Sequence, residues 1–193
     1  MPDYLAIGSD EDYLRIPMGL PTALAVADAY HFSLPTRKMV DAIYHQSDFR
    51  LAPQPMKPGR AMTSTAYYLQ HQQTIEGQRL GHPLDELLSG HKKDIILTKR
   101  LWTRQGKVAI YGWHQRSGQP IQPLSTVHGA RYADYSHGVR LVSTHVLVNG
   151  KPMSIFDALD DPQLAPVLAY EGVIRDAERL MAPSTPPPSR KSE

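Results

Sequence analysis

Residues 90–144 read GHKKDIILTKRLWTRQGKVAIYGWHQRSGQPIQPLSTVHGARYADYSHGVRLVST, and this stretch decides the fold. Short runs of β-branched and aromatic residues alternate in it with polar turns, which is typical of a small sheet that presents side chains at its strand ends. The pattern predicts strands over residues 94–98, 107–113 and 119–124, and a long strand over residues 139–148. Because the strand at 107–113 is apolar on both faces, we expect it in the middle of the sheet.

Helices and turns surround this sheet. A proline in the first turn, Pro21, predicts a helix that runs to about residue 30. The other predicted elements are a hairpin of residues 4–8 and 13–18, a helix that begins at Thr36, an extended connector over 51–62, a helix over 65–80, a short helical turn over 83–88, a hairpin turn at residues 149–150, a helix capped by Ser154, and short helices over 162–169 and 173–181.

These elements predict an α+β fold, with a small, mostly antiparallel sheet from the C-terminal half packed against helices from the N-terminal half. Residues 1–181 are expected to form a single α+β domain. Residues 182–193 read APSTPPPSRKSE, and this composition is typical of a disordered tail.

Composition excludes several classes of function. The 193-residue chain carries a formal charge of +2 with neutral histidines, and its basic residues are scattered along the sequence. Phosphate binding needs a clustered basic field, so nucleic acid is not expected as a partner. The absence of cysteine excludes disulfides, thiolate zinc sites and cysteine nucleophiles.

The sequence predicts a soluble protein. No apolar run approaches the ~18 residues of a membrane-spanning helix, and the N-terminus lacks the basic and apolar regions of a signal peptide. The chain opens almost directly into the strand-like residues 4–7. This leaves room for a longer natural N-terminus with an export signal, so the compartment stays open, as does the oligomeric state.

The stretch that decides the fold also collects histidines and acids. These are His91, His114, His128 and His137, with Asp94 and Asp134 close to them in the sequence. Imidazole and carboxylate ligands around an open water position form the usual catalytic zinc site. We therefore expect His91, His114 and His137 as ligands of one divalent metal ion, with zinc as the first candidate, although no local signature such as HExxH is present.

The same residues could act in acid–base catalysis without a metal, because a histidine pair supplies both an acid and a base near neutral pH. The catalytic candidates are His91, Asp94, His114 and His137. The substrate-binding candidates are Lys92, Trp113, Tyr135 and Arg140. The residues expected to orient the catalytic groups or to relay protons are His128, Asp134 and Ser136. The polar helix over residues 65–80 would form a wall of the cleft.

Residues 127–142, VHGARYADYSHGVRLV, resemble a known signature. In L,D-transpeptidases of the bacterial cell wall, an HG pair is followed by SHGC and then by an Arg–Leu pair. The matching positions are His128 and Gly129, then Ser136, His137 and Gly138, and finally Arg140 and Leu141. Val139 stands where that family has its nucleophilic cysteine, and the gap between the two HG pairs is shorter than in that family, so the resemblance does not imply transpeptidation.

A larger block, GHKKD…VAIYGWH…DYSHGVRLV, is similar to that of an uncharacterised family of bacterial hypothetical proteins. This resemblance implies no particular activity. Two functions therefore stay open. One is a hydrolase of a polar polymer, with bacterial cell-wall peptide or glycan as the leading substrate. The other is a non-catalytic carbohydrate- or peptide-binding or structural module, in which the histidines satisfy tight turns and the aromatic residues stack on sugars or fill the core.

Overall fold

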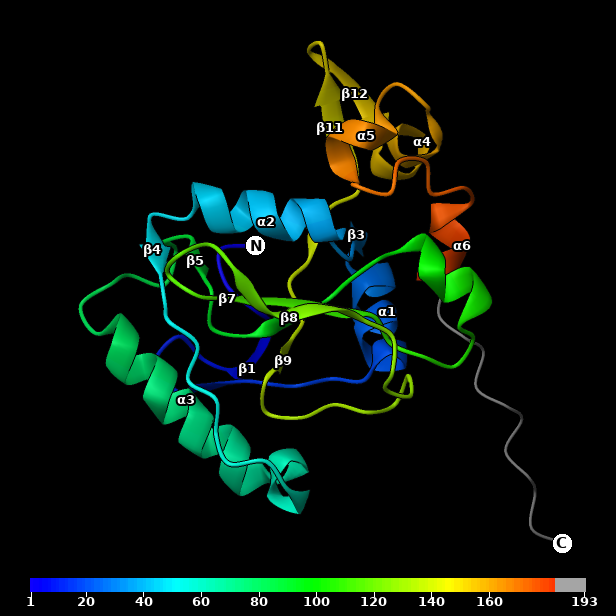
Figure 1. The fold of residues 1–193 in the computed structure, drawn as a ribbon. Coiled ribbons are helices and arrows are strands. Elements are labelled where there is room, and N and C mark those ends of the chain that lie inside the picture. Colours follow the sequence, from blue (N-terminus) through cyan, green and yellow to red (C-terminus); the bar gives the residue numbers. More distant parts are fainter. Residues whose placement is uncertain (183–193) are drawn as a thin grey trace, which may run out of the picture.

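The computed structural model describes residues 1–182, which form an α+β fold around a four-stranded sheet (Figure 1). The strands of this sheet are β6 (Lys93–Ile95), β7 (Ile110–His114), β8 (Pro120–Ser125) and β9 (His137–Gly138). Their order is β8-β7-β6-β9. Strand β6 pairs antiparallel with β7 and parallel with β9. The predicted sheet is therefore confirmed, and the strand predicted at its centre lies between two neighbours.

Eight short strands form pairs outside this sheet. The pairs are β1 (Ala6–Gly8) with β2 (Tyr13–Arg15), β3 (Phe32–Ser33) with β10 (Val142–Ser143), β4 (Phe49–Arg50) with β5 (Leu88–Ser89), and β11 (His145–Val148) with β12 (Lys151–Ser154). All are antiparallel except β4–β5. The turn between β11 and β12 has positive φ at Asn149 (51°) and Gly150 (79°), which is the geometry expected for a tight hairpin with an Asn–Gly turn.

Helices cover the sheet from several sides. They are α1 (Leu20–Ala29), α2 (Arg37–Gln46), α3 (Thr65–Arg79), α4 (Ile155–Asp160), α5 (Ala165–Leu168) and α6 (Ala177–Met181), with 3-10 helices η1 (Arg60–Thr63) and η2 (Lys99–Thr103). Figure 1 shows α2 and α3 on different sides of the central sheet, while β11, β12, α4 and α5 form a lobe at the top.

Side-chain caps explain where three of these helices begin. The hydroxyl of Thr36 accepts a hydrogen bond from the Met39 amide at 3.3 Å, and Ser64 accepts one from the Tyr67 amide at 3.3 Å. Ser154 does the same for the Phe156 amide at 3.2 Å. Each cap satisfies an amide that has no partner within the first turn of its helix. The predicted starts at Thr36, at residue 65 and after Ser154 are thus confirmed.

Apolar residues pack on both faces of the sheet. The main core includes Ile95 of β6, Ile110 of β7 and Val139, all of which are almost completely buried. A second cluster contains Ile96 and Val40, so it lies between the sheet and α2. The central strands are therefore buried on both faces, which agrees with the apolar pattern of the sequence.

Two predicted elements are wrong. The strand expected over residues 139–148 is broken into β10 and β11, because residues 139–141 leave the sheet and pack into the core. The helical turn expected over residues 83–88 is a loop that enters β5. Its end is held by the Leu88 amide, which donates to Pro2 O at 3.0 Å. In both segments, pairing with distant residues overrides local propensity.

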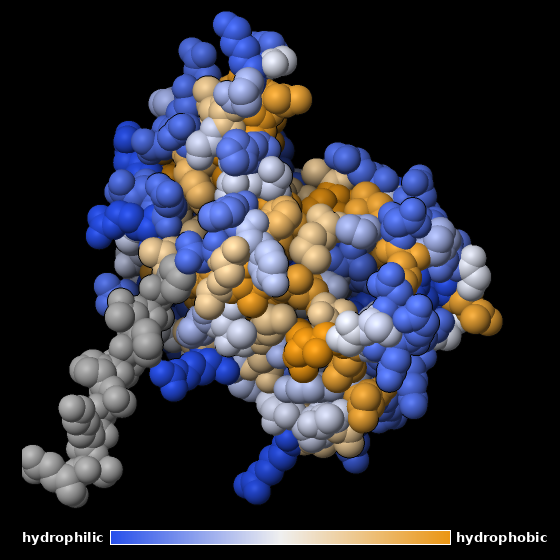
Figure 2. Space-filling model, turned by 180° about the vertical axis from the view of Figure 1, so that it is seen from behind, coloured by the Kyte–Doolittle hydropathy of each residue, from blue (hydrophilic) through white to orange (hydrophobic). Residues whose placement is uncertain are grey.

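The surface is mixed in character. Figure 2 shows hydrophobic residues in patches at the middle of one face, with hydrophilic residues around them. A cleft of about 750 Å³, lined mainly by apolar residues, lies between α1 and the β1–β2 hairpin. No helix among residues 1–182 combines the length and the apolar character needed to cross a bilayer. The tail predicted for residues 182–193 lies, beyond its first residue, outside the described residues.

Candidate functional site

The sheet divides the predicted site residues between its two faces. Lys93 of β6 is paired with His137 of β9, and the next residue, Asp94, is paired with Gly138. Because successive side chains of a strand point to opposite faces, His137 and Asp94 lie on opposite faces of the sheet. His114 lies on the α2 side, where its ring stacks on Tyr44 with centroids 4.6 Å apart. The sequence could not show this separation, because it depends on the register between β6 and β9.

The first group of site residues surrounds the N-terminal segment. The hydroxyl of Tyr4 donates to the Asp94 carboxylate at 2.9 Å, and the guanidinium of Arg140 lies 4.5 Å from the centroid of the Tyr4 ring. Gly138 has no side chain at the point where the ring passes; a Cβ there would lie 2.5 Å from Tyr4. Burial raises the pKa of Asp94 to about 6, although Arg140 and the Tyr4 hydrogen bond act in the opposite direction.

His91 belongs to an ion-pair network with residues that precede the sheet. Its Nε2 lies 3.0 Å from Asp3 Oδ1, and the other Asp3 oxygen lies 2.6 Å from the guanidinium of Arg15. Burial lowers the pKa of His91 to about 4, so the ring is neutral at pH 7 and donates its Nε2–H to Asp3. Burial alone would raise the pKa of Asp3, but His91 and Arg15 hold it well below its ordinary value.

Arg140 holds the N-terminal segment in place. Its guanidinium donates to the carbonyl oxygens of Met1 and Pro2 at 2.9 and 2.8 Å, and to that of Leu88 at 2.6 Å. The residue is 1% exposed. Arg140, predicted to bind substrate, thus donates hydrogen bonds to backbone carbonyls of the chain itself.

His114 is fixed by α2. Its Nε2 lies 2.8 Å from Asp41 Oδ1, and the hydroxyl of Tyr111 donates to the same oxygen at 2.8 Å. Burial would raise the pKa of Asp41, but the hydrogen bonds from His114 and Tyr111 hold it below the ordinary value. This arrangement resembles a structural anchor between β7 and α2.

The second group lies on the opposite face, in the loop before β9. The Asp134 carboxylate accepts hydrogen bonds from the Ser136 hydroxyl at 2.5 Å, from the Ser136 amide at 2.8 Å and from the Tyr132 hydroxyl at 2.9 Å. His137 Nε2 lies 4.0 Å from Asp134 Oδ2, and neither ring nitrogen of His137 has a hydrogen-bond partner among residues 1–182. The ring of His128 stacks on Tyr132 with centroids 4.3 Å apart and lies beside His137.

Burial sets the protonation of this group. Burial lowers the pKa of His137 to about 4, with Asp134 acting in the opposite direction. Burial would raise the pKa of Asp134, but His137 and the Ser136 hydrogen bonds hold it below its ordinary value. At neutral pH the pair therefore consists of a neutral imidazole and a carboxylate.

A third group contains Lys92, Trp113 and Tyr135, all predicted to bind substrate. The ammonium of Lys92 donates to the Tyr135 carbonyl at 2.7 Å, and burial lowers the pKa of this lysine to about 7. Trp113 has φ of 56°, in the left-handed region that a bulky residue rarely adopts. His71 of α3 lies against both rings, with centroids 6.2 Å from Trp113 and 5.0 Å from Tyr135.

The expected metal site is not assembled. No three His, Asp or Glu side chains within residues 1–182 are placed to hold one metal ion. His91 and His114 are each engaged by a separate carboxylate, and His137 lies on the other face of the sheet. Coordination by this trio would require converging nitrogens. The failure has a physical reason, because Asp3 and Asp41 each hold one of the histidines away from His137.

The position of Val139 bears on the transpeptidase-like signature. Val139 is 0% exposed and packs in the main core, and its carbonyl accepts a hydrogen bond from the Leu5 amide at 2.8 Å. The position that holds the nucleophile in L,D-transpeptidases is thus turned into the core. Ser136, the residue directly before His137, donates a hydrogen bond from its hydroxyl to Asp134 instead.

Several residues that complete these groups were missed from the sequence. They are Asp3, Tyr4, Arg15, Asp41 and His71. All belong to the N-terminal half, and their partners lie far away in the sequence. No local spacing connects them, so a single sequence carries no signal for these contacts.

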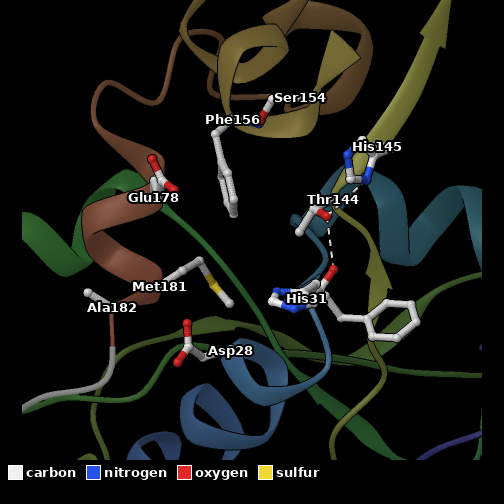
Figure 3. Close-up of a pocket in the computed structure, with 10 residues that line it drawn as sticks. Asp28, His31, Thr144, His145, Ser154, Phe156, Glu178, Met181 and Ala182 are labelled. Carbon is white, nitrogen blue, oxygen red and sulfur yellow. Dashed lines mark hydrogen bonds between the residues drawn. The ribbon is translucent and has the colours of Figure 1, made fainter. Parts of the chain in front are cut away.

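Clefts on the surface lie largely apart from these groups. One of about 220 Å³ includes Asp3 and Tyr4 in its lining. Another, of about 460 Å³, lies between α1, α6 and the top lobe (Figure 3). Phe156 and Met181 point into it, and the Thr144 hydroxyl donates to the His31 carbonyl at 2.9 Å on its edge. Its acids, Asp28 and Glu178, are exposed to solvent.

Comparisons with protein-family models, with curated proteins and with solved structures find no match for this chain.

Proposed function

We propose that this chain is a hydrolase of a polar polymer in which His137 is the general base and Asp134 its acidic partner. The observation that carries this proposal is the state of His137. The ring is 0% exposed, has no hydrogen-bond partner at either nitrogen and lies 4.0 Å from a carboxylate oxygen. A buried imidazole without partners is costly for stability, and such groups are typical of functional sites.

The geometry supports water activation. A gap of 4.0 Å between His137 Nε2 and Asp134 Oδ2 is too long for a hydrogen bond, but one water molecule or substrate hydroxyl would bridge groups separated in this way. The neutral imidazole would take a proton from that water while the water oxygen attacks the scissile bond. The same proton would then pass to the leaving group, so that water is added across the bond.

Neighbouring residues would position these groups. Ser136 and Tyr132 both donate to Asp134, which fixes the carboxylate beside the imidazole. The stacked rings of His128 and Tyr132 are only partly buried and lie between His137 and solvent. A substrate would reach His137 when this pair moves aside. The resemblance of residues 127–142 to a cell-wall enzyme signature favours cell-wall peptide or glycan as the substrate class.

A digestion assay tests this proposal. His137→Gln should lower the rate of release of amines or reducing ends from purified bacterial cell wall by at least 100-fold, because the base is lost, while the melting temperature stays near that of the wild type. His145→Gln, on the exposed β11 strand, is the matched control and should retain full activity. Equal activity of His137→Gln and wild type would contradict the role of His137.

One observation favours a non-catalytic module instead. The predicted catalytic residues His91, Asp94, His114 and His137 are at most 3% exposed, and two of the histidines are each held by a carboxylate of the chain. Under this alternative, His137 serves packing alone. His137→Gln would then lower the melting temperature, and neither variant nor wild type would release products.

A further inference from the structure

Three aromatic side chains from distant parts of the chain pack against one another, and one of them belongs to α3. His71 comes from α3, Trp113 from β7 and Tyr135 from the loop before β9. The ring centroids are 6.2 Å apart for His71 and Trp113, 5.0 Å for His71 and Tyr135, and 6.2 Å for Trp113 and Tyr135. Lys92 reaches the same place, because its ammonium donates to the Tyr135 carbonyl at 2.7 Å.

The polar atoms of this group lack acceptors. Trp113 Nε1 and His71 Nδ1 are buried without a hydrogen-bond partner among residues 1–182. Trp113 is 4% exposed and His71 is 1% exposed. An indole N–H only donates, and an ammonium carries three donors, of which Lys92 uses one. Trp113 and Lys92 therefore supply donors that need an acceptor, and His71 supplies another in the tautomer that carries its hydrogen on Nδ1.

The cation of this group also lacks a carboxylate in direct contact, because Asp3 and Asp134 attract Lys92 only from beyond ion-pair distance. Lys92 is 3% exposed, yet among the described residues no carboxylate oxygen lies within ion-pair distance of its ammonium. A second lysine, Lys93, lies 5.2 Å from the centroid of the Trp113 ring. Buried charges in proteins are normally paired, so the place lacks a negative partner.

The backbone conformation that places the indole here is energetically unfavourable for a tryptophan. Gly112 and Trp113 have φ of 110° and 56°, so β7 departs from regular strand geometry where the indole is placed. Residues that hold sparsely populated conformations cluster at binding and catalytic sites. The conformation interrupts the alternation of β7 and brings the ring toward Lys93, which occupies the face of His137.

We propose that His71, Lys92 and Trp113 form a subsite for a carboxylate group of the substrate. A carboxylate accepts hydrogen bonds at both oxygens, and its negative charge would pair with the ammonium of Lys92. The inference deepens the proposed function and rests on it for the statement that the ligand is a substrate; binding itself is measurable without catalysis. It narrows the substrate class to molecules with a free carboxylate, such as peptides with a free C-terminus or an acidic side chain.

Fluorescence of Trp113 provides the test. In a Trp102→Phe background, Trp113 is the single tryptophan, and sodium acetate should change its emission in a saturable way. Acetamide has nearly the same shape without the charge and should bind at least 10-fold more weakly. Both titrations are carried out at constant ionic strength and pH.

Two variants test the donors in the same background. Lys92→Met and His71→Phe keep much of the side-chain volume and should each weaken acetate binding at least 10-fold. The matched control is Lys107→Met, because Lys107 also donates to a carbonyl, that of Val127 at 2.9 Å, but on an exposed segment. Circular dichroism and melting temperature verify that each variant is folded.

The outcomes separate this inference from the proposed function. Absence of a saturable, charge-dependent signal in the folded single-tryptophan protein, or unchanged binding in both variants, would mean that ordered water alone satisfies the donors and would overturn the subsite. Acetate binding by a wild-type protein that releases no products from cell wall supports the subsite while contradicting the hydrolase. Loss of hydrolysis in His137→Gln with intact acetate binding supports both.

Discussion

At the scale of single residues, the sequence shows which side chains carry chemistry but not which of them meet. The histidines of residues 90–144 stand out by composition, whereas their carboxylate partners Asp3 and Asp41 lie in unremarkable local sequence. No spacing rule predicts contacts between residues that are tens of positions apart in the sequence. The pairs His128–Gly129 and His137–Gly138 show this too, because they have the same sequence but different surroundings in the fold.

These two glycines give a matched prediction. A Cβ at Gly138 would lie 2.5 Å from the Tyr4 ring, whereas a Cβ at Gly129 would meet its nearest neighbour, Gly106 O, at 4.0 Å. Overpacking of this kind costs about 1–3 kcal/mol. Gly138→Ala should therefore lower the free energy of unfolding in urea by about 2 kcal/mol or more, and Gly129→Ala should change it by less than about 0.5 kcal/mol. Equal effects would show that Tyr4 does not pack against β9.

At the scale of elements, periodicity and caps predicted most helices and the first hairpin, because both signals are local. The strand expected over residues 139–148 failed, since a run of apolar residues does not distinguish a strand from a segment that enters the core. The short strands β3, β4 and β5 were also missed. Each consists of two residues that pair with a distant segment, so no local period exists to detect them.

The cap of α3 gives the prediction at this scale. Ser64 accepts a hydrogen bond from the Tyr67 amide, and its loss leaves that amide without a partner in the first turn. Ser64→Ala should lower the free energy of unfolding by about 1 kcal/mol. Thr65→Ala, at the adjacent exposed position, is the control and should have little effect in the same urea titration. An unchanged stability of Ser64→Ala would mean that tertiary packing alone fixes the start of α3.

At the scale of the whole molecule, the fold buries an unusual number of neutral imidazoles. Burial lowers the pKa of His91 and His137 to about 4 and that of His71 to about 2. Unfolded histidines titrate near 6.5, so the unfolded chain binds more protons as the pH falls below that value. The contribution of these three imidazoles to stability is then complete above pH 6.5 and declines toward pH 4. Asp94 acts in the opposite direction, because burial raises its pKa to about 6, but one carboxyl opposes three imidazoles.

We therefore expect the melting temperature to fall steeply between pH 6.5 and pH 4, where each buried imidazole costs roughly 3 kcal/mol. His71→Phe and His137→Gln should each make this fall less steep, because they remove a group that must be kept neutral. The exposed His145→Gln should leave the profile unchanged. A melting temperature that stays constant down to pH 4 would show that these rings are protonated in the folded state.

The contacts of the N-terminal segment have a consequence for synthesis of the chain. Residues 1–5 emerge from the ribosome long before residues 139 and 140, yet Leu5 pairs with Val139 and the carbonyls of Met1 and Pro2 are held by Arg140. These contacts therefore form only after most of the chain has been translated, at roughly 5–20 residues per second. The contact of Asp3 with His91 and the packing of Tyr4 on Gly138 are then late events of folding. A ribosome that stalls before residue 138 would carry a nascent chain with an open sheet edge at β6, which is a target for chaperones.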